Sequence, residues 1–206
     1  MTAASPLIHV VDDDDSLRTA LLRLLDAAGF EARGYASTGE FLLHPLADRP
    51  GCLLLDVRLP GPSGLELQDA LQHHGATLPV VFLTGHADVP SSVRAMKAGA
   101  VDFLEKPVER ATLLAALRRA LERDAAERAA RDEAARLRAL FATLTPRERE
   151  VFERIVAGKL NKQIADELKT SERTVKSQRA QLMLKLGVDS AAELGRLAEQ
   201  LRHTSA

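Results

Sequence analysis

Short apolar runs alternate, in the first half of the chain, with stretches in which apolar residues recur at helical spacing. The runs predict five β-strands, at residues 7–11, 30–35, 52–56, 80–84 and 101–105. Continuous apolar runs are typical of parallel strands that helices cover on both faces. Amphipathic helices are expected from about residues 16, 37, 64, 89 and 109. The pattern therefore predicts an α/β domain with a five-stranded parallel, doubly wound sheet.

A long connecting helix is predicted next. From residue 108 to 145 there is neither glycine nor proline, and strong helix formers dominate. Asp124 and Arg128 are one of several acid-before-base pairs at i, i+4 spacing, which support an exposed helix. Beyond Arg123 the apolar side is mostly alanine, too thin for a strong coiled coil. We interpret this part as a solvated spacer, with a weak dimer helix as the alternative.

Four shorter helices are predicted after the connector. The first begins at Thr145-Pro146-Arg147-Glu148, which provides an N-cap, a proline at the first helical position and a capping glutamate. Others are expected at 161–168, at 172–186 and after Ser190. Two helices joined by a tight turn are typical of helix-turn-helix proteins, whose second helix enters the major groove of DNA. The expected division is a first domain at 1–122, a helical linker at 123–139 and an all-α four-helix domain at 140–206.

Length and composition agree with two intracellular domains. The 206 residues suffice for two modest domains. The single cysteine, Cys52, cannot form an intramolecular disulfide and is interpreted as a buried thiol rather than a nucleophile. No apolar stretch approaches the roughly 20 residues that span a bilayer, and the N-terminus does not look like a signal peptide. We therefore expect a cytoplasmic protein with no membrane partner.

The net charge of -1 hides an uneven distribution. Residues 1–107 hold 8 basic and 14 acidic side chains, residues 108–139 hold 8 and 6, and residues 140–206 hold 12 and 9. A modest basic excess is by itself a weak indication of nucleic-acid binding, because solvated surfaces often carry one. Whether the chain binds nucleic acid therefore has to be judged from its sequence motifs.

Polar residues follow four of the predicted strands. Asp12 and Asp13, then Asp56, Thr84 and Lys106, each come after an apolar run, and the carboxyl ends of parallel strands meet at one crevice. Three carboxylates together favour a hard cation, and Mg²⁺ fits best. Asp56 can then attack a phosphoryl donor while a hydroxyl and an ammonium hold the phosphoryl oxygens. The alternative is that the acids merely end strands in water.

Four motifs resemble the receiver domain of bacterial two-component response regulators, over about residues 5–122. They are Val10-Val11-Asp12-Asp13, Leu55-Asp56-Val57-Arg58-Leu59-Pro60, Thr84-Gly85-His86 and Lys106-Pro107. The resemblance implies a flavodoxin-like fold and phosphorylation of Asp56 by a sensor histidine kinase. It also implies that Asp13, Asp56 and the backbone carbonyl of Arg58 bind Mg²⁺, with Asp12 assisting through water.

The same resemblance implies a conformational switch. Thr84 would move toward the phosphoryl group while Phe103 turns inward, although a plain core phenylalanine is the alternative for Phe103. The Lys-Pro bond is commonly cis in this family, which would aim Lys106 into the site. Arg58 and His86 stand two residues after the acceptor and the threonine. We expect them to influence the lifetime of the acyl phosphate, in a direction that the sequence does not fix.

The third of the four C-terminal helices carries side chains suited to DNA. Val175, Leu182 and Leu186 point inward at helical spacing, and lysine, arginine, glutamine and serine on the remaining surface suit base edges and phosphates. A solvated basic face is the alternative. The candidate DNA-binding residues are Arg173, Lys176, Ser177, Gln178, Arg179 and Ala180.

Residues 140–203 resemble the LuxR-type four-helix DNA-binding domain. The motifs are Leu144-Thr145-Pro146-Arg147-Glu148-Arg149-Glu150-Val151, Asn161-Lys162-Gln163-Ile164-Ala165, Thr174-Val175-Lys176 and Lys185-Leu186-Gly187. The resemblance implies that Lys176, Ser177 and Ala180 face bases. Gln178 stands where histidine is common, and Ala180 lacks a longer polar side chain, so the target sequence does not transfer from relatives. Residues 84–90 and 96–100 further resemble the FixJ branch.

The expected function is a phosphorylation-activated transcription factor. Phosphorylation would produce a homodimer through the face of helix four, strand five and helix five, with Val89, Val93 and Met96 as candidates. A dimer would bind paired promoter half-sites. Activation is favoured over repression, and RNA polymerase is a candidate partner. The stimulus, the target promoters and the resting domain arrangement stay open.

Two other functions are weighed against this one. An enzyme that hydrolyses phosphate esters through an aspartyl intermediate would need a second acid two residues past the nucleophile, where this chain has Arg58. A module that binds partners without phosphate would be expected to lack one of Asp13, Asp56, Thr84 and Lys106. We therefore expect no enzymatic activity beyond slow loss of the protein's own phosphoryl group.

Overall fold

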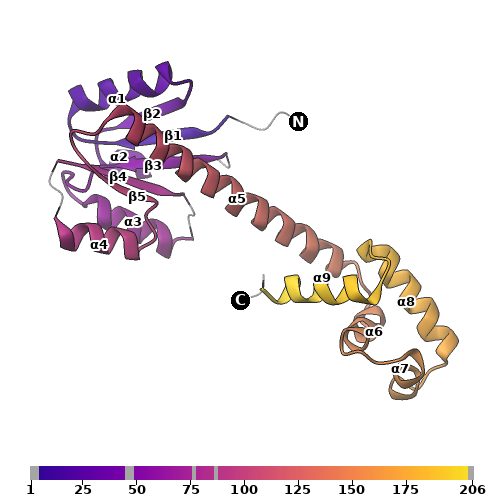
Figure 1. Cartoon of the computed structure of the whole chain (residues 1–206). Coiled ribbons are helices and arrows are strands. Elements are labelled where there is room, and N and C mark those ends of the chain that lie inside the picture. The colour runs from indigo at the N-terminus through magenta and orange to yellow at the C-terminus, as the bar shows by residue number, and fades with distance from the viewer. Residues whose placement is uncertain (1–4, 45–48, 76–77, 86–87, 204–206) are drawn as a thin grey trace. The chain divides into compact units, whose positions relative to one another are not determined.

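The computed structural model describes residues 5–44, 49–75, 78–85 and 88–203. The chain divides into two compact units at Arg128 and Ala129. The first is an α/β unit and the second is helical, as the indigo-to-magenta and orange-to-yellow parts of Figure 1 show. Among the described helices, none is both long enough and apolar enough to cross a bilayer.

Five parallel strands form the sheet of the first unit, in the order β2-β1-β3-β4-β5. The strands are β1 (Leu7–Val11), β2 (Glu31–Tyr35), β3 (Gly51–Leu55), β4 (Val80–Thr84) and β5 (Asp102–Glu105). Residues of β1, β3 and β4 are almost all buried, which is why their sequences read as continuous apolar runs. The predicted five-stranded, doubly wound sheet is confirmed.

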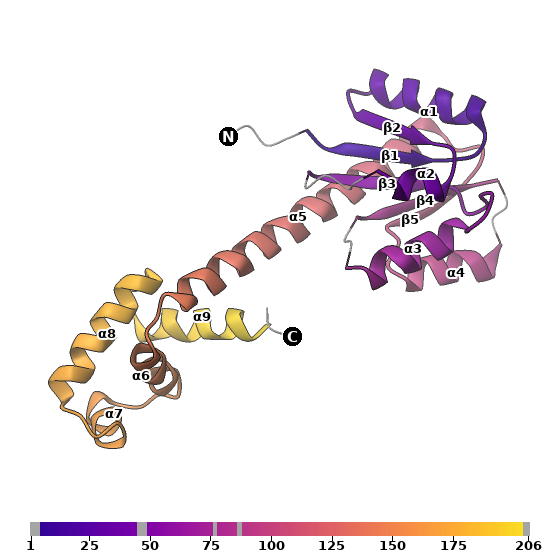
Figure 2. The same cartoon turned by 180° about the vertical axis from the view of Figure 1, so that it is seen from behind.

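Helices cover both faces of this sheet, as the two views in Figure 1 and Figure 2 show. They are α1 (Asp15–Ala27), α2 (Thr38–Leu42), α3 (Gly64–His73), α4 (Val89–Lys97) and α5 (Arg110–Ala142). Leu54 packs with residues of α1 and α5, whereas Leu53 and Leu55 pack with residues of α2, α3 and α4. Alternate side chains of one strand therefore supply two separate cores.

A polar group lies inside the second of these cores. His9 on β1 is 8% exposed, and its Nδ1 lies 2.9 Å from the hydroxyl of Tyr35 on β2. The imidazole stacks on the Tyr35 ring at 5.7 Å and meets the edge of Phe41 at 5.4 Å. Burial, and then the nearby Arg33 and Arg49, lower the pKa of His9 from 6.5 to about 4. The side chain is therefore neutral at physiological pH.

α5 is the predicted long helix, and a buried carboxylate fixes it to the sheet. Asp124 is 1% exposed and accepts hydrogen bonds from the backbone amide of Gly51 (2.9 Å) and from Arg128 Nε (2.9 Å). Arg128 also donates to the carbonyl of Arg49 (2.6 Å). The predicted pair of Asp124 and Arg128 is present, but Asp124 is buried rather than exposed, because it is also the acceptor for the first amide of β3.

The second unit is built from the end of α5 and the helices after it. These are α6 (Pro146–Val156), α7 (Asn161–Glu167), α8 (Glu172–Leu186) and α9 (Ala191–His203). Leu137 of α5 is 4% exposed and belongs to the core that Val151, Ile164, Val175 and Leu194 form. The predicted capping box at Thr145 and Glu148 is present, as is the Ser190 cap of α9.

Candidate functional site

Three carboxylates meet at the carboxyl end of the sheet. Asp12 and Asp13 follow β1, and Asp56 follows β3, the strand that pairs with β1. One oxygen of each of the three side chains lies within 4.8 Å of the others. Asp12 is 2% and Asp56 is 8% exposed, whereas Asp13 is exposed. The structure therefore brings together the three acids that the sequence pattern placed at one crevice.

Lys106 reaches into this cluster from the end of β5. Its Nζ lies 2.7 Å from Asp12 Oδ2 and 2.6 Å from Asp56 Oδ2. The Lys106-Pro107 peptide bond is cis, as the family resemblance implied. Burial alone would lower the pKa of Lys106, but its hydrogen bonds to Asp12 and Asp56 outweigh burial, so the pKa is raised. Lys106 is therefore charged and provides one positive charge for three carboxylates.

The charge that Lys106 leaves uncompensated fits a hard cation. Burial raises the pKa of Asp12, with a smaller opposing effect from Lys106. Carboxylate oxygens are the ligands that Mg²⁺ prefers, and a divalent ion would offset the two remaining negative charges. The amide of Asp14 donates to Asp12 Oδ1 (2.9 Å) and the amide of Arg58 donates to Asp56 Oδ1 (3.0 Å), which orients both carboxylates. The donor set thus suits magnesium.

Thr84 and Phe103 lie on the two strands beside the cluster. Thr84 ends β4 and is 1% exposed, and its carbonyl accepts a hydrogen bond from the Lys106 amide (2.8 Å). Phe103 is partly buried on β5, with its ring centroid 5.8 Å from that of Phe82. Their role as a switch pair stays a prediction. His86 lies outside the described residues.

Two residues support the site without having been singled out from the sequence. Arg18 on α1 donates from Nη1 to the backbone carbonyl of Asp12 (2.7 Å) and also pairs with Asp15. Only its i, i+3 spacing from Asp15 hints at this role. A Cβ at Gly64 would lie 2.1 Å from the carbonyl oxygen of Asp56, so no side chain fits where α3 begins. Gly64 therefore allows the chain after Asp56 to turn tightly.

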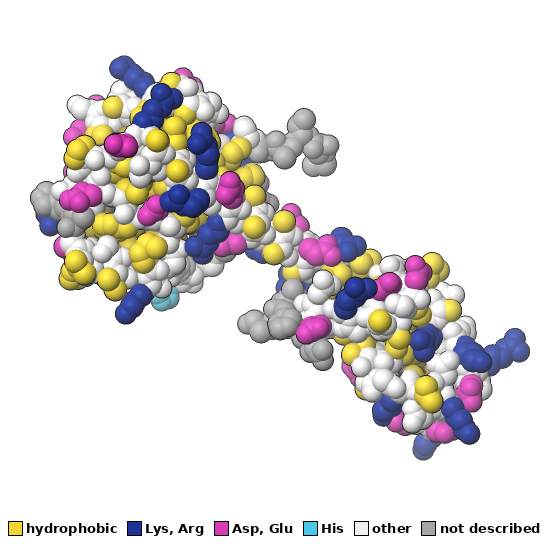
Figure 3. Space-filling model, in the orientation of Figure 1, with side chains coloured by type: hydrophobic (Ala, Val, Ile, Leu, Met, Phe, Trp, Pro, Cys, Tyr) yellow, Lys and Arg dark blue, Asp and Glu magenta, His cyan; other side chains and the backbone are white. Residues whose placement is uncertain are grey.

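The other predicted site is on α8. Exposed side chains form a stripe along the helix at three- and four-residue spacing, namely Arg173, Lys176, Ser177, Ala180, Gln181 and Leu184. This stripe contains four of the six predicted DNA-binding residues. Figure 3 shows lysine and arginine side chains projecting from the surface of the second unit. A helix with one exposed polar stripe and one buried side can present that stripe to a DNA groove.

Gln178 and Arg179 lie off the exposed stripe. Both are partly buried, and Arg179 Nη1 donates to Asn161 Oδ1 on α7 (3.3 Å). Their burial follows from helical spacing. Gln178 and Arg179 lie three and four residues from both Val175 and Leu182, which are buried, so all four side chains lie on the same side of the helix. Their predicted contact with DNA stays a prediction, and the structure gives Arg179 a partner inside the domain.

Both parts of the chain match known protein families. Residues 8–118 match the response regulator receiver domain, and residues 142–198 match the bacterial regulatory proteins of the luxR family. This chain belongs to the response regulators. Its receiver has the predicted receiver fold, and its second unit is a LuxR-type DNA-binding domain.

Relatives and solved structures agree with this assignment over nearly the whole response regulator. Nodulation protein W of Bradyrhizobium diazoefficiens is 45% identical over 95% of this chain and 86% of the relative. Transcriptional regulatory protein FixJ of Azorhizobium caulinodans is 44% identical over 93% of this chain and 90% of the relative. The structure of response regulator StyR has a TM-score of 0.87 at 46% identity and covers 96% of this chain and 100% of StyR. The response regulator is therefore a phosphorylation-dependent transcription regulator of the FixJ type.

Proposed function

We propose that Asp56 accepts a phosphoryl group from a sensor histidine kinase and that this controls DNA binding by the second unit. One observation carries the proposal. Lys106 Nζ lies within 2.7 Å of both Asp12 and Asp56, two members of a three-carboxylate cluster. A cation so placed can hold a phosphoryl oxygen once Asp56 is modified, which is the stabilisation that phosphoryl transfer requires.

In the transfer step, one carboxylate oxygen of Asp56 attacks the phosphorus atom, and the bond between phosphorus and the donor imidazole breaks. Asp13, Asp56 and the Arg58 carbonyl would hold Mg²⁺, with Asp12 acting through water, and the bound ion offsets charge on the phosphoryl oxygens. Lys106 and the Thr84 hydroxyl hold the other oxygens. Movement of Thr84, followed by rotation of Phe103, passes the change to α4 and β5.

We infer that the modified response regulator dimerises through α4, β5 and the first part of α5. Val89, Val93 and Met96 on α4 are 74%, 44% and 47% exposed, which supports a contact surface there. A dimer presents two copies of α8 to paired half-sites. Once one copy is bound, the other is held near its half-site at a high effective concentration, so the dimer binds more tightly than either copy alone. In this proposal the dimer activates transcription, with RNA polymerase as a further partner.

The response regulator is proposed to be phosphorylated once per chain rather than to turn over phosphate esters. Arg58 occupies the position where such a hydrolase would need a second acid. Slow hydrolysis of the acyl phosphate then returns Asp56 to its resting form, and Arg58 and His86 influence the rate.

The test is phosphate incorporation with a small-molecule phosphodonor and Mg²⁺. The wild-type chain is expected to gain one acyl phosphate, which base or hydroxylamine cleaves, and Asp56→Asn is expected to gain none. Asp26→Asn is the matched control, because Asp26 is an exposed aspartate on α1. Equal incorporation in Asp56→Asn and wild type would refute the assignment of the acceptor.

A further inference from the structure

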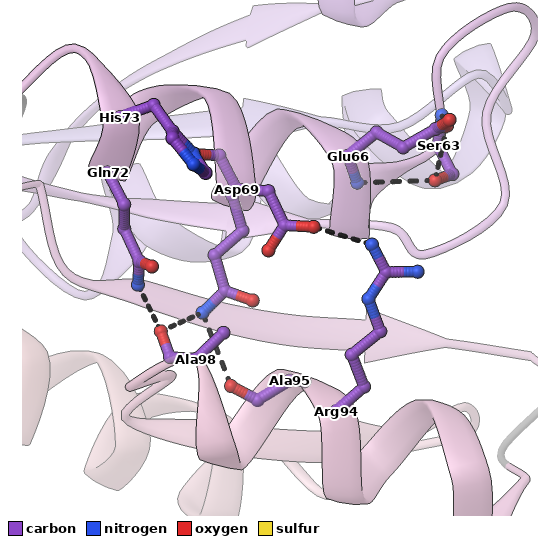
Figure 4. Close-up of polar contacts among 9 residues, drawn as sticks. Ser63, Glu66, Asp69, Gln72, His73, Arg94, Ala95 and Ala98 are labelled. Carbon is purple, nitrogen blue, oxygen red and sulfur yellow. Dashed lines mark hydrogen bonds and ion pairs between the residues drawn. The ribbon is translucent and has the colours of Figure 1, made fainter.

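The C-terminal turn of α4 is held by amide side chains from the neighbouring helix α3. Gln68 Nε2 donates to the carbonyl oxygens of Ala95 (3.3 Å) and Ala98 (2.9 Å). Gln72, one turn later on α3, donates to the same Ala98 oxygen, as Figure 4 shows. The last carbonyl groups of a helix have no partners within that helix, although the Ala95 carbonyl also accepts a hydrogen bond from the Ala100 amide just beyond α4 (3.0 Å). The two glutamines therefore act as a C-terminal cap for α4 that a different helix supplies.

Two charged side chains add to this contact. Arg94 on α4 pairs with Asp69 on α3, also drawn in Figure 4, but both side chains are more than a third exposed. Exposed pairs of this kind contribute little to stability. Arg123 on α5 donates to the carbonyl of Gly99, just beyond α4 (2.9 Å). The C-terminal end of α4 is thus bound by side chains of α3 and α5. Ala95 packs in the same apolar core as Leu67 and Leu71 of α3, and the buried polar contacts with α3 come from Gln68 and Gln72.

The N-terminal half of α4 is held differently. Its cap, Asp88, accepts hydrogen bonds from the amide and hydroxyl of Ser91, and Ser92 donates to the carbonyl of Val89, so these bonds stay within the helix. Among the residues that the structure describes, side-chain hydrogen bonds from other helices reach α4 only from Arg94 onward. Val89 is 74% exposed. Within the described residues, side-chain hydrogen bonds therefore join α4 to other helices at its C-terminal end and not at its N-terminal end, which we call the loosely held end.

Gln68 is also an unusual side chain for its place. It is 2% exposed, and its neighbours Leu67 and Leu71 on α3 belong to the apolar core. Its Oε1 is buried and finds no hydrogen-bond partner within the described part of the chain. A buried acceptor without a partner costs free energy. The Gln68 amide therefore stabilises the fold only through the two hydrogen bonds that its Nε2 donates to α4.

We propose that Gln68 and Gln72 are positioning residues that hold the C-terminal turn of α4 on α3 and thereby oppose the rearrangement of α4 on phosphorylation. The inference rests on the proposed function, in which the change at Asp56 reaches α4 and β5. Thr84, at the end of β4, precedes the loosely held end of α4. The glutamine contacts stabilise the resting position of α4 at its other, C-terminal end. Stronger contacts would therefore require a larger fraction of chains to be phosphorylated before α4 moves.

Two variants test this in the full-length protein. Gln68→Met keeps the length of the side chain but removes both donated bonds and the unpaired oxygen. Gln72→Met removes the other donor at an exposed position, so it is expected to fold even where Gln68→Met does not. Gln200→Met is the matched control, because it makes the same chemical change on an exposed part of α9 in the second unit.

Hydrogen–deuterium exchange is measured first, on peptides covering residues 93–100 and without a phosphoryl mimic. Both receiver variants are expected to exchange faster there than wild type, by about two- to tenfold, since one hydrogen bond exchanged against water is worth a factor of this order. Unfolding midpoints are expected to fall by no more than the loss of one hydrogen bond accounts for. Unchanged exchange at 93–100 in both variants would overturn the proposal.

Calorimetric titration with beryllium fluoride and Mg²⁺ then tests the effect on activation. The concentration that half-saturates the site is expected to fall by about two- to tenfold in the variants and to stay unchanged in Gln200→Met. Faster exchange with an unchanged half-saturating concentration would show that the contacts do not oppose activation. If wild-type protein binds no beryllium fluoride, the proposed function fails, and the exchange measurement alone decides whether the glutamines hold α4.

Discussion

His9 makes the stability of the first unit depend on pH within a window that the structure defines. Its pKa is lowered from 6.5 to about 4, mainly by burial. Between pH 4 and 6.5 the imidazole is therefore protonated in the unfolded chain but neutral in the native state. The free energy of unfolding consequently rises with pH over this range. The contribution of the neutral imidazole is complete above about pH 6.5 and is lost as the pH falls toward 4.

The size of the effect follows from the two pKa values. Between about pH 7.5 and about pH 5 the linkage relation gives a loss of about 2 kcal/mol from this one group. For a unit of this size that loss corresponds to a decrease in the unfolding temperature of roughly 6 to 10 °C. Carboxylates titrate mostly below this range, so the imidazole is the group to test.

The assay uses the single tyrosine of the chain. Tyr35 is the only tyrosine, there is no tryptophan, and Tyr35 lies against His9 in the first unit. Its fluorescence during urea unfolding therefore reports on the first unit alone. His9→Phe is expected to be less stable than wild type at about pH 7.5, because the buried Tyr35 hydroxyl loses its partner, at a cost of about 1–3 kcal/mol. It is also expected to lose almost no further stability at about pH 5.

A control variant separates titration from packing. Phe41→Leu removes the other aromatic neighbour of His9 but leaves the imidazole, so it is expected to be less stable at every pH and to keep the pH dependence of wild type. If His9→Phe and wild type lose the same free energy between the two pH values, His9 is not the group responsible and the argument from its burial is wrong.

Three further outcomes are expected. Asp124→Ala leaves the buried Gly51 amide unpaired and is expected to destabilise the first unit by about 1–3 kcal/mol in urea unfolding. Asp124→Asn keeps an acceptor and is expected to lose less. Equal losses in the two variants would show that the Gly51 amide does not need the acceptor at position 124. Lys185→Met removes the 2.7 Å bond to the nearly buried Glu148 at the capping box of α6, so α8 is expected to bind DNA more weakly with no change in the salt dependence of binding, measured by fluorescence anisotropy. Lys176→Met removes an exposed charge from α8 and is expected to reduce the slope of log affinity against log salt by about 1, and an unchanged slope would exclude a phosphate contact.

The receiver site was largely predictable because strand ends determine it. Once β1, β3, β4 and β5 are recognised as parallel, the residues after them must meet, and this brought Asp12, Asp56, Thr84 and Lys106 together. The hydrogen bond from Arg18 to the Asp12 carbonyl was not predictable in this way, because it depends on how far a long side chain reaches across a loop. Fold class was predictable for the same reason as the site, since continuous apolar runs have few structural explanations.

Asp124 shows where sequence patterns lead to a wrong environment. An acid four residues before an arginine on an alanine-rich helix looks like a surface pair. Its burial depends on the distant start of β3, 73 positions away in sequence, whose amide needs an acceptor. Gln68 is similar, because only the position of α4 explains a buried glutamine in the middle of α3. Local periodicity does not contain such long-range contacts.

Gly64 has a consequence for how this protein tolerates mutation. It has no functional group, yet a methyl group at its α-carbon would collide with the backbone oxygen of Asp56. A saturation library scored for phosphorylation would therefore be expected to reject alanine at position 64 as firmly as asparagine at position 56. A functional acceptor thus requires the absence of a side chain at position 64 as well as a carboxylate at position 56.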